Sequence, residues 1–184
     1  MNLKLLPIEI TLIGMCAALM VIFSQFSVPL PFTSVPITFQ IFGLVLISII
    51  VGAKIATISQ IIFILLGSIG LPVFANFSGG FSIILGPTGG YIFGFIFMAF
   101  LVGRASNNQN TVMLFITSYI GLCIDYIIGT LQLKIVTGIS LKASLIVGVY
   151  PFVGKDIIIL SIAILLGLKV RKKVKGRFIR NVIA

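Results

Sequence analysis

Residues 72–91 of the chain read PVFANFSGGFSIILGPTGGY, and the interpretation of the whole chain depends on this stretch. Five glycines and two prolines within twenty residues oppose a continuous helix, because glycine loses much backbone entropy on folding and proline removes a backbone donor. The stretch has no charged residue, unlike an ordinary surface loop, and it carries four aromatic side chains. In a membrane, irregular backbone is tolerated only where protein covers it or where it lines a cavity. We therefore expect a folded-in loop that caps a binding pocket.

The composition predicts that the loop lies in an integral membrane protein. Hydrophobic residues make up 59% of the 184 residues and charged residues only 9%, and the mean hydropathy is +1.29. A water-soluble domain with this composition would expose large apolar patches. The chain is long enough for about six spans of roughly 20 residues each. We expect an all-α integral membrane protein in which residues 1–184 form a single transmembrane domain.

Six apolar runs are visible along the chain. They cover about residues 8–26, 37–51, 55–71, 89–102, 111–133 and 143–168, and the last is interrupted near residues 151–155. A segment with three prolines, residues 28–36, separates the first two runs. These runs predict six transmembrane helices.

The net charge of +10 is concentrated at one end of the chain, which argues against nucleic-acid binding. Seven of the thirteen basic residues lie in a tail of about residues 169–184. A polybasic tail beside a span is an orientation signal with affinity for anionic lipid headgroups. With an internal N-terminus, ten basic residues fall inside and three outside, so both termini are predicted to be cytoplasmic. The irregular segments 28–36, 72–91 and 151–155 then share the outer face, as the walls and lid of one pocket.

The chain has only three acidic residues. Glu9 begins the first apolar run, where a carboxylate stabilises a helix N-terminus. Asp156 precedes another apolar run, so it is either the N-cap of a helix or a functional group at the edge of the membrane, and both roles are compatible. Asp125 falls within the fifth run; a packing role with a partner such as Ser118 is favoured over a place in the pocket. Tyr126 is interpreted as an interface tyrosine.

Residues needed for catalysis or metal binding are missing. The chain has no histidine, and Cys16 and Cys123 lie in separate apolar runs. This composition provides no metal site, no catalytic triad and no proton relay. The segment 86–91 resembles a phosphate-binding loop, but no Gly-Lys-Ser/Thr follows it. We therefore expect no enzyme activity, no ATP hydrolysis and no cofactor.

Four short segments together resemble the BioY family, the biotin-specific substrate-capture subunits of energy-coupling-factor (ECF) transporters. They are VPITFQ at residues 35–40, GLPVFA at 70–75, SGG at 78–80 with LGPTGGY at 85–91, and PFVGKD at 151–156. The resemblance runs in order over nearly the whole chain. It implies a six-helix bundle in a bacterial or archaeal cell membrane that binds biotin from outside. It further implies two kinds of partner, a transmembrane coupling subunit and two cytoplasmic ATPases that use the ATP.

The resemblance also implies which residues bind biotin. Asp156 and Asn76 match the positions that bind the ureido ring, which offers two N–H donors and one carbonyl acceptor. Phe77 and Tyr91 are expected to pack against the bicyclic ring and the valeryl chain.

The carboxylate of biotin is expected to meet hydrogen-bond donors at the other end of the ligand. Lys155, Ser78 and the backbone N–H groups of Gly79 and Gly80 are the candidates. Many members of the family carry a lysine three positions after the aspartate, where this chain has Ile159. Lys155 is the expected substitute.

The first apolar run contains Gly14-Met-Cys-Ala-Ala18, where the family has two alanines four residues apart. Small residues at this spacing permit close approach of another helix. The resemblance favours Gly14 and Ala18 as a docking site for the coupling subunit, and packing inside the bundle is the alternative.

A self-sufficient secondary transporter is the alternative function. Such a transporter typically has an internal repeat or a relay of ionisable residues. The sequence shows neither feature, so a vitamin-capture subunit is favoured.

Overall fold

Helices dominate the computed structural model, which describes residues 5–108 and 110–174. The α-helices are α1 (Pro7–Gln25), α2 (Gln40–Val51), α3 (Ala53–Ser68), α4 (Phe81–Leu85), α5 (Gly89–Ala105), α6 (Thr111–Thr137), α7 (Leu141–Gly148) and α8 (Tyr150–Val174). Two 3₁₀ turns, η1 (Ala75–Phe77) and η2 (Ser106–Asn108), and two strands, β1 (Ser27–Leu30) and β2 (Thr33–Thr38), complete the described chain.

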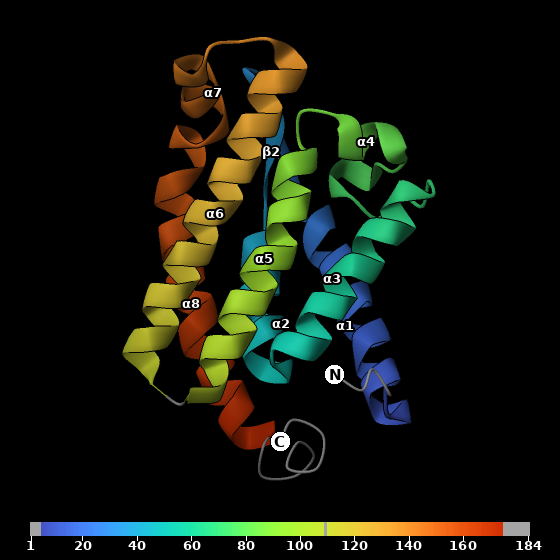
Figure 1. The fold of residues 1–184 in the computed structure, drawn as a ribbon, viewed down its shortest axis with the longest axis vertical. Helices are drawn as coiled ribbons and strands as arrows, with labels where there is room; N and C mark the ends of the chain where they lie inside the picture. Colours follow the sequence, from blue (N-terminus) through green and yellow to red (C-terminus); the bar gives the residue numbers. More distant parts are fainter. Residues whose placement is uncertain (1–4, 109, 175–184) are drawn as a thin grey trace.

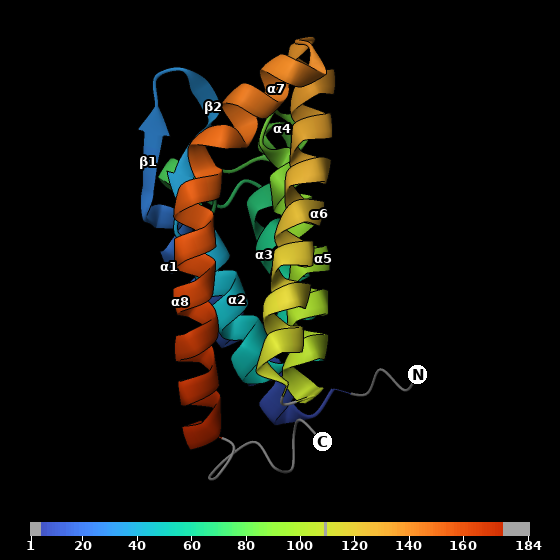
Figure 2. The ribbon, with the colours of Figure 1, turned by 90° about the vertical axis from the view of Figure 1, so that its left-hand side faces the viewer.

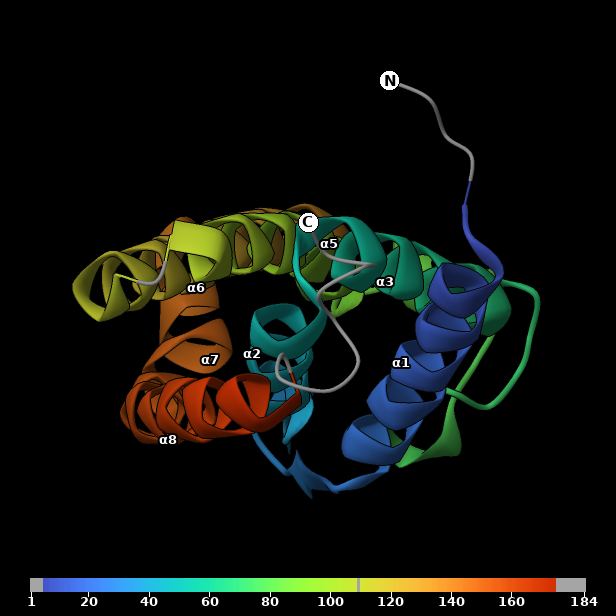
Figure 3. The ribbon, with the colours of Figure 1, turned by 90° about the horizontal axis from the view of Figure 1, so that it is seen from below.

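The long helices lie in two rows (Figure 3). Helices α6, α5 and α3 form one row. Helices α8, α2 and α1 form the second row, which faces the first. The β-hairpin, α4 and α7 lie together at the upper end of the bundle, whereas α1 begins and α8 ends at the lower end (Figures 1 and 2). The irregular segments therefore gather at one end of the molecule.

Four helical segments in the described chain are long and apolar enough to cross a membrane. They are Pro7–Gln25, Gly89–Asn108, Thr111–Thr137 and Tyr150–Val174. Helices α2 and α3 are also apolar but have only 12 and 16 residues. The outer surface of the long helices is apolar too, with Phe97 53%, Ile158 62% and Leu165 53% exposed. Such a surface is suited to contact with lipid.

The prediction of an all-α fold is wrong for residues 27–38, which form an antiparallel hairpin. Ser27 pairs with Thr38 and Val28 with Ile37. The β-branched residues of this segment favour extended backbone. Its prolines are tolerated because both strands of a two-stranded sheet have a free edge.

The predicted interruption of the last apolar run is displaced toward its start. Helix α7 ends at Gly148, and α8 begins at Tyr150, so Pro151 lies in the first turn of α8. Proline is favoured there because its missing N–H has no helical partner in any case. Asp156 lies in the second turn, so the N-cap interpretation of this residue is wrong.

Arg171 closes the lower end of the bundle instead of contacting lipid headgroups. It is 5% exposed. Its guanidinium donates hydrogen bonds to the carbonyl of Ile49, the hydroxyl of Ser106 and Oδ1 of Asn107. It thereby connects α8 to the end of α2 and to η2. Lys169, Lys172 and Lys173 are exposed, and the remaining basic residues of the predicted tail lie outside the described residues.

Candidate functional site

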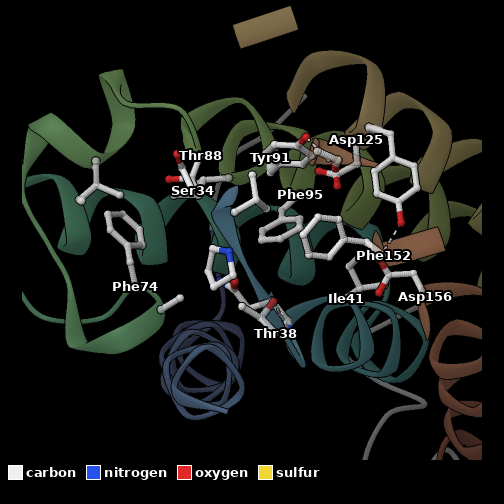
Figure 4. Close-up of a pocket in the computed structure, with 18 of the residues that line it drawn as sticks. Ser34, Thr38, Ile41, Phe74, Thr88, Tyr91, Phe95, Asp125, Phe152 and Asp156 are labelled. Carbon is white, nitrogen blue, oxygen red and sulfur yellow. Dashed lines mark hydrogen bonds between the residues drawn. The ribbon is translucent and has the colours of Figure 1, made fainter. Parts of the chain in front are cut away.

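A cavity of about 180 Å³ lies at the upper end of the bundle, where the irregular segments meet the two rows of helices (Figure 4). One water molecule needs only about 15 Å³ on this measure, so the cavity has room for a small organic molecule. Its polar lining residues include Ser34, Thr38, Asn76, Ser78, Thr88, Tyr91, Asp125, Tyr126, Lys155 and Asp156. Phe95 and Phe152 lie between Phe74 and the two aspartates in the view of Figure 4.

The connector between α3 and α4, residues 69–80, is anchored by Phe74. Its side chain is 2% exposed and meets the ring of Phe63 edge-on, with 5.5 Å between the centroids. The amide of Gln25 at the end of α1 donates to the carbonyls of Val73 and Phe74 at 3.2 and 3.1 Å. The predicted folded-in loop is therefore packed against α1 and α3, and it forms one wall of the cavity.

Asn76 lies at the tip of this connector with a left-handed φ of 57°, a conformation that asparagine tolerates better than most residues. Its Oδ1 accepts a hydrogen bond from the hydroxyl of Ser27 at 2.8 Å. Its backbone N–H donates to the same hydroxyl at 3.1 Å. The carboxamide oxygen is therefore engaged by the hairpin, which leaves the Nδ2 group of Asn76 as a donor for a ligand.

Asp156 is the centre of the polar end of the cavity, and it is 1% exposed. Tyr126 donates to Asp156 Oδ2 at 2.6 Å, across from α6 to α8. Lys155 Nζ lies 2.6 Å from Oδ1 and donates to the carbonyl of Thr38 at 2.9 Å. Lys155 therefore pairs with Oδ1, and because each carboxylate oxygen has two lone pairs, the Asp156 carboxylate keeps the capacity to accept a further hydrogen bond. Tyr126 is thus part of the site, and its interpretation as an interface tyrosine was incomplete.

Tyr91 and Asp125 complete this end. The Tyr91 hydroxyl donates to the carbonyl of Gly148 at 2.9 Å, which fixes the ring against the α7–α8 junction. Asp125 also lines the cavity. Ser118, its suggested packing partner, donates instead to Leu114 of its own helix. The favoured packing role of Asp125 is therefore wrong, and the place in the pocket is correct.

Three of the residues predicted from the resemblance do not line the cavity. The side chain of Phe77 is 72% exposed, and the N–H of Gly80 donates to the carbonyl of Gly67 at 2.7 Å. Gly79 passes so close to the carbonyl of Leu71 that a Cβ atom would overlap it. Gly79 therefore has a structural reason to be glycine. The structure instead brings Phe95 and Phe152 to the cavity, and nothing in their sequence context distinguishes them from other apolar residues.

Gln132 is a supporting residue that no sequence pattern distinguishes from other polar residues. Its Nε2 group donates to the carbonyls of Ile84 and Gly86 at 2.7 and 2.8 Å, and so holds the α4–α5 connector against α6. We expect Gln132→Leu to lower the free energy of unfolding by about 1–3 kcal/mol, because it leaves two carbonyls without donors. Thermal unfolding of the purified protein measures this loss. Lys134→Leu, at an exposed position of the same helix, is the control and should melt like the wild type.

Gly14 and Ala18 are exposed on the outer face of α1. No side chain of the described residues comes within 4 Å of a Cβ atom built on Gly14. Packing of this pair inside the bundle is therefore wrong, and the pair forms a smooth patch open to a neighbouring helix.

The cavity is suited to reversible binding. It combines carboxylate acceptors, amide and ammonium donors and aromatic walls, which is the usual arrangement of a small-molecule site. In residues 5–108 and 110–174 no group of three His, Cys, Asp or Glu side chains could hold a metal ion. A ligand with both N–H donors and a carbonyl acceptor matches these groups.

Comparison with known proteins connects this geometry to a family. The profile described as "BioY family" matches residues 1–176. The chain is 38% identical over 160 residues to the "Biotin transporter BioY" of Thermotoga maritima, covering 86% of this chain and 93% of that protein. It is 36% identical over 158 residues to the "Probable biotin transporter BioY" of Pyrococcus horikoshii, covering 86% and 93%.

A solved structure is similar along almost the full chain. The crystal structure of the S-component for biotin from an ECF-type ABC transporter has a TM-score of 0.81 and 29% sequence identity, and the match covers 89% of this chain and 90% of that chain. The transporter relatives and the apolar helices together identify a multi-pass membrane protein.

Proposed function

The chain belongs to the BioY family, and on that premise we propose that it is the biotin-binding substrate-capture subunit of an ECF-type importer. It is not an enzyme and needs no cofactor; the partner ATPases use the ATP. The observation that carries this proposal is the shared cavity of Asn76 and Asp156, which come from segments 80 residues apart along the chain and line one cavity.

The free hydrogen-bonding groups of the cavity complement the ureido ring of biotin. The Asp156 carboxylate accepts one ureido N–H, and Asn76 Nδ2 donates to the ureido carbonyl. Phe95, Phe152 and Tyr91 provide flat apolar surface for the bicyclic ring and the valeryl chain. This assignment replaces Phe77, whose side chain is exposed and does not line the cavity, by the two phenylalanines that line it.

The carboxylate of biotin needs donors away from the aspartates. Lys155 does not meet this condition, because its Nζ lies 2.6 Å from Asp156 Oδ1 and donates to the carbonyl of Thr38. Lys155 therefore belongs to the ureido end in this assignment. Ser78 lines the cavity, but its hydroxyl donates to the carbonyl of Ala75, so its contribution requires rotation of the side chain.

We propose that α1, α2, α3, α5, α6 and α8 are six spans of one transmembrane domain in a bacterial or archaeal cell membrane, with both termini cytoplasmic. Helix α1 begins and α8 ends at the lower end in Figure 1. Lys54 lies in the first turn of α3, Arg104 in the last turn of α5 and Arg171 in the last turn of α8. The cavity then opens to the outside. The Gly14–Ala18 patch of α1 would receive the transmembrane coupling subunit, which carries two cytoplasmic ATPases.

Equilibrium binding tests this function. We expect the purified chain, without other subunits and without ATP, to bind radiolabelled biotin saturably. Lipoate is the matched competitor, since it shares the carboxylate-bearing chain of biotin but has no ureido ring, and it should not displace biotin. A chain that binds no biotin would contradict the proposal.

Proteoliposomes that contain only this chain separate the proposal from the alternative of a secondary transporter. We expect no accumulation of biotin when an ion gradient is imposed. Gradient-driven accumulation would establish the alternative in its place.

A further inference from the structure

Asp125 presents a buried carboxylate to the cavity without an internal partner. The residue is 1% exposed. Its Oδ1 atom is buried and has no hydrogen-bond partner among the residues that the structure describes. An unpaired polar atom in a low-dielectric site is costly, and a charged one more so. A partner that enters the cavity would remove this cost.

Helix α5 makes room for this carboxylate. A Cβ atom built on Gly94 would overlap Asp125 Oδ1, and would also lie 2.8 Å from its Cα. The two helices therefore approach closely at this point, and the side chain of Asp125 is confined next to the cavity. Asp125 and Asp156 lie on the same side of the cavity, away from Phe74 (Figure 4).

We infer that Asp125 is a second ureido-binding carboxylate. The inference rests on the proposed function and deepens it. The ureido ring has two N–H donors that diverge, and two carboxylates, those of Asp125 and Asp156, line the cavity. Each accepts one N–H, while Asn76 donates to the carbonyl. All three polar groups of the ring are then satisfied, and analogues that lack one N–H are rejected because a carboxylate would remain unpaired.

The packing of Asp125 against Gly94 does not supply its carboxylate with a hydrogen-bond donor. Of the hydroxyl residues that precede it on α6, Thr117 and Ser118 donate to carbonyls of their own helix, and Tyr119 contacts Ile157 and Ser161 of α8. Tyr126 donates to Asp156 and Tyr91 to Gly148. Ser118 and these two tyrosine hydroxyls thus donate to other groups.

The test combines an altered residue with an altered ligand. Asp125→Ala should weaken biotin binding by about 10- to 100-fold, the usual range for a hydrogen bond to a charged group. Biotin methylated at one or the other ureido nitrogen should bind the wild type poorly, because the methyl group meets a carboxylate. In Asp125→Ala, the space left by the carboxylate accommodates the methyl group of one of the two isomers. For that isomer, the loss of affinity relative to biotin should be much smaller in the variant than in the wild type. A structural role would not produce this preference for one isomer.

Ser118→Ala is the matched control, since Ser118 is buried on the same helix but does not line the cavity. It should leave the binding of all three ligands unchanged. Asp125→Asn keeps the size of the side chain and provides a second variant if the alanine variant does not fold. Wild-type affinity for biotin in both Asp125 variants, or the same ranking of the three ligands in wild type and variant, would overturn the inference while the proposed function stands. Absence of biotin binding to the wild type would overturn the proposed function itself.

Discussion

Asp156→Asn is expected to weaken the binding of biotin by up to about 100-fold. A hydrogen bond to a charged group contributes about 1.5–3 kcal/mol, which corresponds to roughly a 10- to 100-fold change in affinity. Asp156 is 1% exposed and lies 2.6 Å from the ammonium of Lys155, so the variant leaves that ammonium without its counter-charge. It also replaces the proposed acceptor of a ureido N–H. Equilibrium binding of radiolabelled biotin measures the loss.

Two further variants separate the contribution of the Asp156 carboxylate to biotin affinity from that of neighbouring residues. Tyr126→Phe removes the 2.6 Å hydrogen bond to Asp156 but keeps the charge, and should weaken binding by only about tenfold. Ser161→Ala is the control. Ser161 lies on α8, as Asp156 does, but it forms a hydrogen bond with Tyr119 and does not line the cavity. It should bind biotin like the wild type. Unchanged affinity in Asp156→Asn would show that the ligand site has been placed at the wrong end of the cavity.

Phe74→Ala should lower the free energy of unfolding by about 3–5 kcal/mol, the usual cost of truncating a buried phenylalanine. Phe74 is 2% exposed and packs against Phe63, and it is the main apolar anchor of the connector that carries Asn76. We therefore expect a melting temperature that is roughly 10 °C lower and a weaker affinity for biotin. Thermal unfolding with and without biotin measures both effects.

Phe77→Ala is the matched control for this variant. Phe77 lies three residues further along the same connector, but its side chain is 72% exposed. Truncation there should change the free energy of unfolding by less than about 0.5 kcal/mol. If both variants melt alike, the connector is not held by Phe74. If Phe77→Ala weakens biotin binding, the assignment from the family resemblance is correct, and the exposed ring moves onto the ligand.

The sequence was sufficient to predict the membrane class, the helical runs and the folded-in connector. Apolar runs of membrane length and uncharged glycine-rich backbone are local signals with one dominant physical explanation. The hairpin was missed because three prolines in residues 28–36 resemble an unstructured linker, although each strand of a two-stranded sheet tolerates proline at its free edge.

The cavity could be predicted only in part, because its members are selected by three-dimensional contact. Asp125 and Ser118 are both buried polar residues of one apolar run, two helical turns apart on the same face, and only the position of the cavity along the helix distinguishes them. Arg171 appears in the sequence as one of several basic residues near the end of the chain, but its position on the helix directs it to the carbonyl of Ile49 and to η2. Gly79 was selected as an anion-binding residue, whereas it permits the close passage of the backbone beside Leu71.

The hydrogen bond from Tyr126 to Asp156 makes one carboxylate common to α6 and α8. A ligand that competes for the oxygens of Asp156 therefore changes the contact that sets the distance between these two helices. From these residues, α6 runs about 22 Å back to its first residue and α8 about 27 Å forward to Val174 at the standard rise per residue. A small change in the angle between the two helices is magnified over such lengths. We therefore expect the occupied and empty states to present different helix ends to the proposed partner subunits, so that binding at one end of the bundle is transmitted to the other.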